Sequence, residues 1–368
     1  MRELRYDLWS VSLLAALGVG CAGGGPVKEA TADEMAPARS EHYLEIGGIP
    51  KPWSVSVRPL GTGQGSELAV TSHKANVLEV WRVGPERSPR KVASSGEVGF
   101  HPDEVRWLDW DGDGEDRELL VAGEGSGQVQ LWRWDGETLL CTDAVRIRQA
   151  PRDAFAADLD GDGHQDIVSG PYKAGDVTVL WGKGGFEFEV EELAGNETPA
   201  HPRPIDWDGD GRTDIAWSEW DTGPVKVAFN RGDRRLEVVT LDDLPGKAPR
   251  QLTVGDVDGD GRDDLVVAME LGKAARVLYN RGDGGEVEKA DIPAPVWGYS
   301  AAAVGSTADG GRLLALSEEQ RIILARALLQ GASIIILDEP TSSLDSESET
   351  YIQSAMERLR ADRNVTLI

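Results

Sequence analysis

The stretch that decides the fold is D-L-D-G-D-G-H-Q-D, from Asp158 to Asp166, because the chain repeats it. The same pattern, D-x-D-G-D-G-x-x-D, begins again at Asp206 and at Asp256, and a looser copy begins at Asp109. The four copies start 49, 48 and 50 residues apart. A fixed period of this length indicates a repeat architecture in which each unit forms one supersecondary structure.

The composition of the string predicts a calcium loop. Carboxylates at positions 1, 3 and 5 converge on one point if the backbone curls tightly, and the glycines at positions 4 and 6 permit that curl. Position 7 would offer its backbone carbonyl, and the aspartate at position 9 would complete the shell. Such a shell suits Ca²⁺, which takes about six to eight oxygen ligands, whereas Zn²⁺ favours His and Cys. The predicted ligands are Asp158, Asp160, Asp162, His164, Asp166, Asp206, Asp208, Asp210, Arg212, Asp214, Asp256, Asp258, Asp260, Arg262 and Asp264.

The looser copy leaves a fourth calcium site open. It supplies Asp109, Asp111 and Asp113, but Arg117 stands at position 9, between Asp116 and Glu118. Ligation at this end of the loop would require a shifted backbone. An acidic surface turn is the simpler alternative for all four copies, because Asp-Gly is common turn chemistry.

An EF-hand begins with a similar string but requires a Glu at position 12 and a helix afterwards. Position 12 is Ser169, Trp217 and Val267 in the three intact copies, and β-like runs such as I-V-S-G follow position 9. These residues exclude the EF-hand.

An aromatic residue marks each unit 23 positions after its first aspartate: Trp132, Trp181, Phe229 and Tyr279. Each ends a strand-like run, such as V-T-V-L-W. Several short strands in each unit of about 50 residues predict four-stranded blades and an all-β propeller. Residues 53–316 contain five whole units and the opening of a sixth, and the units at Trp53 and near Gly305 lack the acidic string.

The acidic strings at this spacing resemble FG-GAP/VCBS-type repeats, the calcium-looped propeller blades also found in integrin α heads. S-G-P-Y, after Asp166, loosely echoes the motif that names them. The resemblance implies a β-propeller with calcium at the rim of each loop-bearing blade, in an extracellular or cell-surface binding protein. Propellers of this family commonly have seven blades.

The amino end predicts export. Residues 1–21 contain Arg2 and Arg5, a mostly apolar run and then Cys21; the run is too short to span a bilayer and indicates a secretion signal. L-G-V-G-C resembles a bacterial lipoprotein cleavage box with Cys21 as the lipidated residue, which implies a protein anchored at the cell envelope. Residues 22–52, rich in Gly, Ala, Pro and Glu, are typical of a flexible tether.

The carboxyl end, residues 317–368, has a different pattern from the repeats and predicts a short α/β fragment. I-I-I-L-D-E-P-T-S-S-L-D resembles the Walker B strand and D-loop of an ABC transporter ATPase, which implies magnesium at Asp338, a water-activating base at Glu339 and a D-loop Asp345. No G-x-x-x-x-G-K-[ST] occurs in the sequence, so we do not expect this chain to hydrolyse ATP. A junction near 316–318 is the simplest interpretation.

Three functions remain open at this point. The first is a non-catalytic, calcium-stabilised propeller that binds a glycan or a protein outside the cytoplasmic membrane. The second is a propeller-type polysaccharide-active enzyme, for which His101 and His201, each followed by Pro, are the candidate catalytic residues. The third is an ABC transporter ATP-binding subunit. The formal net charge of −26 disfavours nucleic acid as a partner, because binding phosphates requires clustered cations.

Overall fold

Each repeat unit forms one four-stranded antiparallel sheet in the computed structural model of the chain. The structure describes residue 49 and residues 52–306, with short gaps at 62–63, 85–88, 97, 100, 172–174, 221–222, 245–247, 270, 272–273, 283–286 and 294–298. It also describes residues 312–318, 334–335 and 366–367.

The strands follow one another in sequence order within every sheet. Blade 1 contains β1 (Pro52–Pro59), β2 (Ser66–Ser72), β3 (Val77–Val83) and β4 (Pro89–Ser94). Blade 2 contains β5 (Pro102–Leu108), β6 (Glu118–Gly123), β7 (Gln128–Trp134) and β8 (Leu139–Arg146). Blade 3 contains β9 (Pro151–Ala157), β10 (Asp166–Pro171), β11 (Gly175–Gly182) and β12 (Phe188–Glu197). Blade 4 contains β13 (Pro199–Ile205), β14 (Asp214–Glu219), β15 (Val225–Asn230) and β16 (Leu236–Asp242). Blade 5 contains β17 (Pro249–Gly255), β18 (Asp264–Met269), β19 (Ala274–Tyr279) and β20 (Glu288–Pro293).

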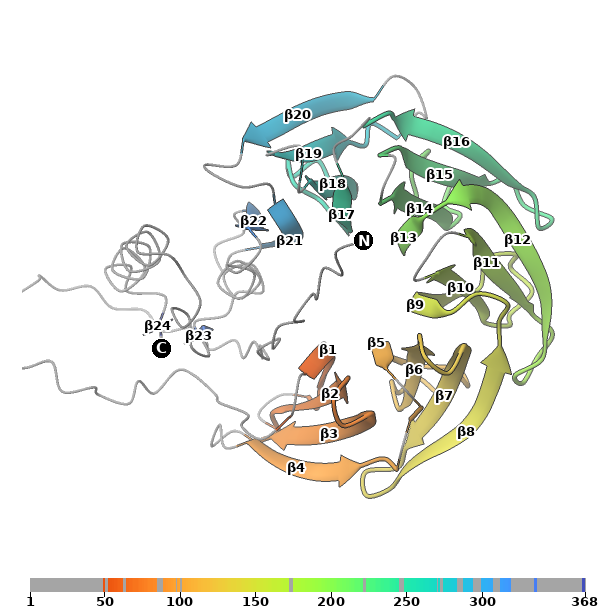
Figure 1. Cartoon of the computed structure of the whole chain (residues 1–368), viewed down its shortest axis with the longest axis vertical. Helices are drawn as coiled ribbons and strands as arrows, with labels where there is room; N and C mark the ends of the chain where they lie inside the picture. The colour runs from red at the N-terminus through yellow and green to blue at the C-terminus, as the bar shows by residue number, and fades with distance from the viewer. Residues whose placement is uncertain are drawn as a thin grey trace, which may run out of the picture.

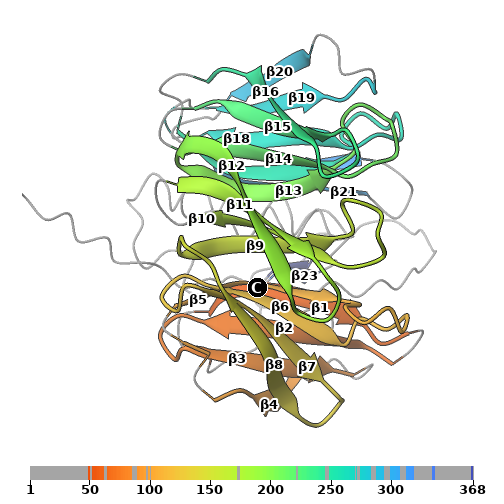
Figure 2. The same cartoon turned by 90° about the vertical axis from the view of Figure 1, so that its right-hand side faces the viewer.

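The sheets are arranged around a common axis as the blades of a propeller, with the first strand of each nearest the axis and the fourth at the rim (Figure 1). Turned by 90°, the sheets are seen from the rim, with blades 1 and 2 overlapping at the bottom of the view and blades 4 and 5 overlapping at the top (Figure 2). The blades follow an arc that ends at β21 (Tyr299–Ser306), which pairs only with β22 (Arg312–Glu318). The predicted five units and the opening of a sixth are therefore confirmed.

The second strand of each blade is buried along its whole length, for example E-L-L-V-A-G in β6 and D-L-V-V-A-M in β18. Such continuous apolar runs are expected where both faces of a sheet are covered. In blades 2 to 4 the two faces of this strand lie in different hydrophobic clusters, which join the blade to its two neighbours. Burial of each Val or Leu side chain contributes about 1.5–3 kcal/mol, so these strands dominate the stability of the stack.

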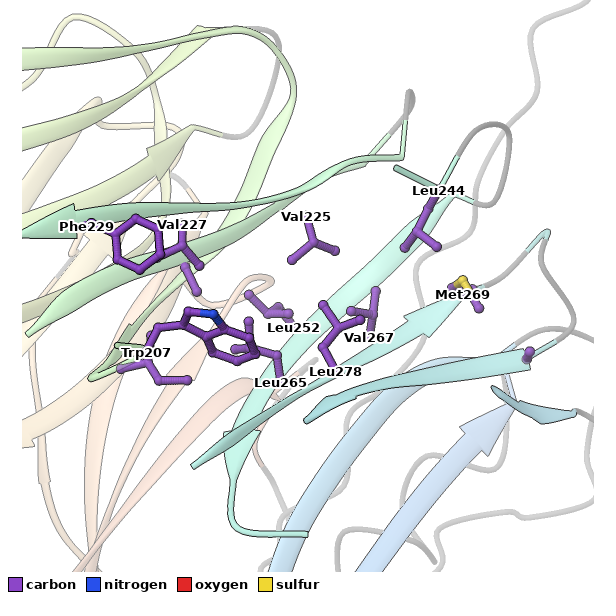
Figure 3. Close-up of a cluster of buried hydrophobic side chains, with 13 residues drawn as sticks. Trp207, Val225, Val227, Phe229, Leu244, Leu252, Leu265, Val267, Met269 and Leu278 are labelled. Carbon is purple, nitrogen blue, oxygen red and sulfur yellow. The ribbon is translucent and has the colours of Figure 1, made fainter. Parts of the chain in front are cut away.

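The core between blades 4 and 5 illustrates the packing. Trp207, Val227 and Phe229 of blade 4 face Leu252, Leu265 and Val267 of blade 5 (Figure 3). The aromatic markers lie at this kind of seam: Trp132, Trp181 and Phe229 are buried, and Tyr279 is half-buried against a core cluster. The expectation that each unit supplies one packing aromatic is confirmed.

The carboxyl end contributes two further features. β22 extends to Glu318, two residues beyond the predicted end of the propeller region. β23 (Ile334–Ile335), at the predicted Walker B strand, pairs in parallel with β24 (Thr366–Leu367). No helix among the described residues is long and apolar enough to cross a membrane.

Candidate metal centre

The four acidic loops occupy equivalent places in blades 2 to 5. Each connects the first strand of its blade to the second, so all four lie at the same end of the propeller. The first residue of β10, β14 and β18 is the aspartate at position 9 of the string. The repeat period is therefore the period of one structural joint.

The loop at Asp158 is curled by its own hydrogen bonds. Gly161 N and Gly163 N donate to the two oxygens of Asp158, at 2.8 and 3.0 Å. Both glycines have positive φ, 77° and 86°, which L-residues other than Gly rarely adopt. An added Cβ at either position would meet nothing within 4 Å, so the backbone conformation, and not space, requires glycine here.

The aspartate at position 9 is a buried joint between strands. Asp166 accepts hydrogen bonds from Leu159 N at 2.8 Å and from Gly182 N at 2.7 Å. Asp214 and Asp264 make the same pair of bonds, to the amides of Trp207 and Asn230 and of Val257 and Asn280. The second partner lies 24 residues after the first aspartate of the string, and sequence reasoning missed it. The repeated N-R-G-D at Asn230 and Asn280 is the signal that marks it.

In each of the four loops, three acidic residues offer oxygens that lie within 4.8 Å of one another. The sets are Asp158, Asp160 and Asp166; Asp206, Asp208 and Asp210; Asp256, Asp258 and Asp260; and Asp109, Asp111 and Glu118. The predicted ligands Asp113, Asp162, Asp214 and Asp264 belong to the same four strings but lie outside these sets. A donor set made only of carboxylates fits Ca²⁺.

Asp208 supplies a further observation of fit. Its Oδ2 accepts a 2.6 Å hydrogen bond from Arg231 Nη1, while its Oδ1 is buried and has no hydrogen-bond partner. A buried carboxylate oxygen without a partner is costly. Because Asp208 converges with Asp206 and Asp210, a cation in the loop would satisfy this oxygen. Asp206, Asp208 and Asp210 would hold the calcium ion.

In the three intact loops, an arginine side chain donates to one oxygen, Oδ2, of the position-3 carboxylate. Arg281 Nη1 donates to Asp258 Oδ2 at 2.7 Å, as Arg231 does to Asp208. Asp160 instead receives Arg234 Nε, at 2.6 Å, from the neighbouring blade 4. A guanidinium on Oδ2 fixes the carboxylate. The Oδ1 atoms of Asp160 and Asp258 also accept the N–H of the position-5 aspartate, at 3.1 Å in both loops.

The residues at position 7 are exposed, and their amides curl the loop. His164 N, Arg212 N and Arg262 N donate to the position-5 aspartates at 2.8, 2.9 and 2.9 Å. The Arg212 and Arg262 side chains also pair with these aspartates. The proposed carbonyl ligation by position 7 stays a prediction.

The loop at Asp109 uses Glu118 in place of the missing position-9 aspartate. Glu118 Oε2 accepts from Trp110 N at 3.2 Å, the bond that Asp166 makes with Leu159 N. Arg117 pairs with Glu115 instead. The longer Glu side chain, one residue later, reaches the same place. Sequence reasoning named Glu118 only as a neighbour of position 9. The signal that identifies it is a Glu, one methylene longer than Asp, standing one residue after the position where the other copies have Asp.

Burial raises the pKa of these inner acids. It raises the pKa of Asp214 to about 6, and Asp208 and Asp210 add to the rise, while hydrogen bonds from Asn230 N and Trp207 N oppose it. Burial likewise raises the pKa of Asp166, Asp264 and Glu118. In the absence of a cation the crowded carboxyls therefore favour protonation, and a divalent ion would relieve the same repulsion.

His101 lies directly before β5 of blade 2, and His201 lies within β13 of blade 4, each toward the end of the strand opposite the acidic loop. Both have positive φ, 53° for His101 and 51° for His201. The His101 ring stacks on His73, with ring centroids 4.8 Å apart. His201 Nδ1 donates to Asp153 Oδ2 at 3.1 Å.

Asp153 joins three blades. It is 1% exposed and also accepts from Arg203 Nη1 of blade 4 at 2.6 Å and from Arg106 Nη2 of blade 2 at 3.1 Å. Despite its burial, the two arginines hold the pKa of Asp153 well below its usual range. Burial, with Arg203 and Arg152 nearby, lowers the pKa of His201. These contacts identify a structural role for His201.

Four predicted site residues lie outside the described residues: Cys21, Asp338, Glu339 and Asp345. Residues 1–21 and nearly all of the tether, 22–52, also lie outside them.

Fold and loops together define a β-propeller in which blades 2 to 5 carry an acidic loop between their first two strands. The family comparison agrees. The FG-GAP-like repeat matches residues 109–169, 158–217 and 206–267, and the FG-GAP repeat matches residues 248–287. Residues 109–287 of this chain are FG-GAP repeats.

Solved structures share the fold at low sequence identity. A chain in the crystal structure of BBS1N in complex with ARL6DN, soaked with lead, superposes with a TM-score of 0.52 and 14% identity. The match covers 73% of this chain and 76% of that chain. The same complex soaked with mercury gives a TM-score of 0.50 and 13% identity.

The curated relatives match only a short part of this chain. The ATP-dependent lipid A-core flippase of Aliivibrio fischeri is 52% identical over 60 residues, and that of Haemophilus influenzae is 50% identical over 60 residues. Each match covers 16% of this chain and 10% of the flippase. In Colwellia psychrerythraea, flippase 2 is 41% identical over 87 residues, which are 23% of this chain and 15% of the flippase. The chain thus spans about a tenth of the length of the first of these relatives, and the predicted similarity to an ABC transporter is confirmed.

Proposed function

We propose that the FG-GAP propeller binds calcium at the loops that begin at Asp158, Asp206 and Asp256, with a fourth site at Asp109. The observation that carries the proposal is the buried Asp208 Oδ1, which has no hydrogen-bond partner and belongs to one of the four acidic sets. Arginine pairs with one oxygen of each of Asp160, Asp208 and Asp258, which holds these carboxylates in place as candidate ligands.

We further propose a non-catalytic binding module, exported and anchored at the bacterial cell envelope through Cys21, with a glycan or a protein as its ligand. Calcium sites of extracellular modules function at about 10⁻⁴–10⁻³ M, which suits loops as exposed as these. The resemblance of residues 1–21 to a lipoprotein signal supports the location. The acidic surface, with a net charge of −26, argues against a nucleic-acid partner.

The flippases' transport activity is not part of this proposal. The shared segment is about a tenth of a flippase, and the sequence contains no phosphate-cradling G-x-x-x-x-G-K-[ST].

Calorimetric titration of the full chain with calcium tests the metal sites. We expect three or four ions per chain, and one fewer in Asp208→Asn, whereas Asp143→Asn, on an exposed stretch of β8, keeps the wild-type number. Absence of binding at millimolar calcium would refute the proposal. A panel of glycans and envelope proteins, with and without calcium, tests the ligand class; turnover of a polysaccharide would favour the enzyme instead.

A further inference from the structure

Asn230 connects the acidic loops of two neighbouring blades. It is 1% exposed at the end of β15, and its main-chain N–H donates to Asp214 Oδ1 at 2.7 Å. Its side-chain Nδ2 crosses the seam to Leu159 O of blade 3, at 2.6 Å. Leu159 is position 2 of that loop, and its own N–H donates to Asp166. One residue therefore fixes the position-9 acid of its own loop and the backbone of the preceding loop.

Asn280 repeats the connection at the next seam. It is also 1% exposed, and its N–H donates to Asp264 Oδ1 at 2.9 Å. Its Nδ2 donates to Asp206 O of blade 4 at 3.0 Å. The hydrogen bonds thus form a continuous path through three loops, from Asp166 by way of Asn230 to Asp214, and from Asp206 by way of Asn280 to Asp264.

Further contacts reinforce the two seams. At the first, Arg234 Nε of blade 4 donates to Asp160 Oδ2 of blade 3 at 2.6 Å. At the second, a Cβ added to Gly209 would lie 3.1 Å from Gly282 O of blade 5. Each loop is therefore in direct contact with the turn after the third strand of the following blade.

The path ends at blade 3, because Gly182 stands where the asparagines stand in blades 4 and 5. Gly182 N keeps the bond to Asp166 Oδ1, at 2.7 Å. It has no side chain to cross to the Asp109 loop of blade 2, and an added Cβ would lie 2.4 Å from Gln165 O. The seam between blades 2 and 3 therefore lacks this connection.

We propose that Asn230 and Asn280 are positioning residues that couple calcium binding between the loops at Asp158, Asp206 and Asp256, and that the loop at Asp109 binds independently. The inference rests on the calcium binding proposed above. Binding in one loop fixes its backbone carbonyl, which holds the asparagine of the next blade and, through its N–H, the next position-9 carboxylate. The second ion then meets a loop that is already ordered, so its affinity rises.

Hydrogen-exchange mass spectrometry of the full chain tests the coupling, because calcium-dependent protection of each loop gives a separate calcium midpoint. Asp208→Asn disables the loop across the connected seam, and we expect it to raise the midpoint of the Asp158 loop by about fivefold or more. Asp111→Asn disables the loop across the unconnected seam and leaves that midpoint unchanged. In an Asn230→Ala background, Asp208→Asn has no further effect on it.

Two Asn230 variants separate the loss of coupling from a loss of folding. Asn230→Ala keeps the main-chain bond to Asp214, and Asn230→Asp also keeps the side-chain oxygen that accepts from Gly232 N at 3.0 Å. Both lose the Nδ2 donor, so both abolish the coupling, and Arg234→Gln shows whether the guanidinium carries part of it.

Calcium protection that survives Asp208→Asn with an unchanged Asp158 midpoint overturns the coupling while leaving the metal sites intact. Persistence of the effect in both Asn230 variants assigns the coupling to other contacts and overturns the role of the asparagine. If calcium protects none of the loops, the calcium sites themselves are wrong.

Discussion

Replacing Asp153 with Asn is expected to destabilise the propeller by about 3 kcal/mol. The carboxylate is 1% exposed and accepts hydrogen bonds from Arg106, His201 and Arg203, which belong to blades 2 and 4. Asn has the same shape but no charge, so two guanidiniums lose their counter-ion, and one of its two terminal side-chain atoms, Nδ2, presents donors toward other donors.

The magnitude follows from burial. Breaking a buried ion pair by changing one partner typically costs about 3–5 kcal/mol. The Arg203 side chain is 15% exposed, so the cost of removing its partner lies near the upper part of that range. The Arg106 side chain is 33% exposed and regains water when its partner is lost, which lowers the cost. We therefore expect about 3 kcal/mol, which lowers the Tm by about 6–12 °C for a unit of this size.

Thermal and urea unfolding followed by circular dichroism, at saturating calcium, measure this change. Asp143→Asn is the matched control, because it makes the same chemical change on an exposed part of β8, where substitutions typically stay within about 0.5 kcal/mol. If Asp153→Asn melts with the control, the three-blade joint contributes no net stability and the reasoning from burial is wrong.

Four other predictions concern the loops, the pH dependence and the core. Chelation of calcium should lower the Tm, since a calcium concentration of 100 times the Kd of a site adds about 2.7 kcal/mol to the free energy of unfolding. An unchanged melting curve contradicts this. Glu118→Gln should remove one calorimetric calcium site while Arg117→Gln retains it, and equal stoichiometry would exclude Glu118 as a ligand. Because burial lowers the pKa of His201, the unfolded state takes up its proton first as pH falls below about 6.5, so the contribution of His201 to stability falls by at most about 1.4 kcal/mol per pH unit. Urea titrations should show that His201→Asn flattens this slope, and an unchanged slope would assign it to other groups. Trp217→Ala, at a side chain that is 0% exposed, should cost about 3–5 kcal/mol in urea unfolding; a loss below about 1 kcal/mol would indicate that the seam closes over the cavity.

The blades were predictable because the repeat period can be counted directly in the sequence. The aspartate strings mark the joint between the first two strands, and the aromatics such as Trp181 and Phe229 mark the third strand, so both constraints recur at one period. Counting these two markers was enough to place five whole units and part of a sixth.

Substituted ligands and contacts between units were not predictable in the same way. Glu118 replaces an aspartate at a different position, because a longer side chain compensates for a one-residue shift. Asp153 has no motif, since its partners come from two other blades. Asn230 is visible as part of N-R-G-D, but its bond to Leu159 depends on how two sheets stack. A sequence pattern fixes what each unit contains more readily than what the neighbouring units share.

The asparagine bridges carry a consequence for how such an array changes its length. Asn230 and Asn280 donate to backbone carbonyls of adjacent positions in their target loops, Leu159 O and Asp206 O. Every residue has a backbone carbonyl. The Nδ2 group of one blade's asparagine can therefore find an acceptor in the loop of whichever blade precedes it. Excision of the 50 residues from Asp206 to Gly255 would bring Asn280 against the loop of blade 3 and leave no buried amide orphaned. Gene duplication and loss can therefore lengthen or shorten the row in whole periods without redesigning its joints.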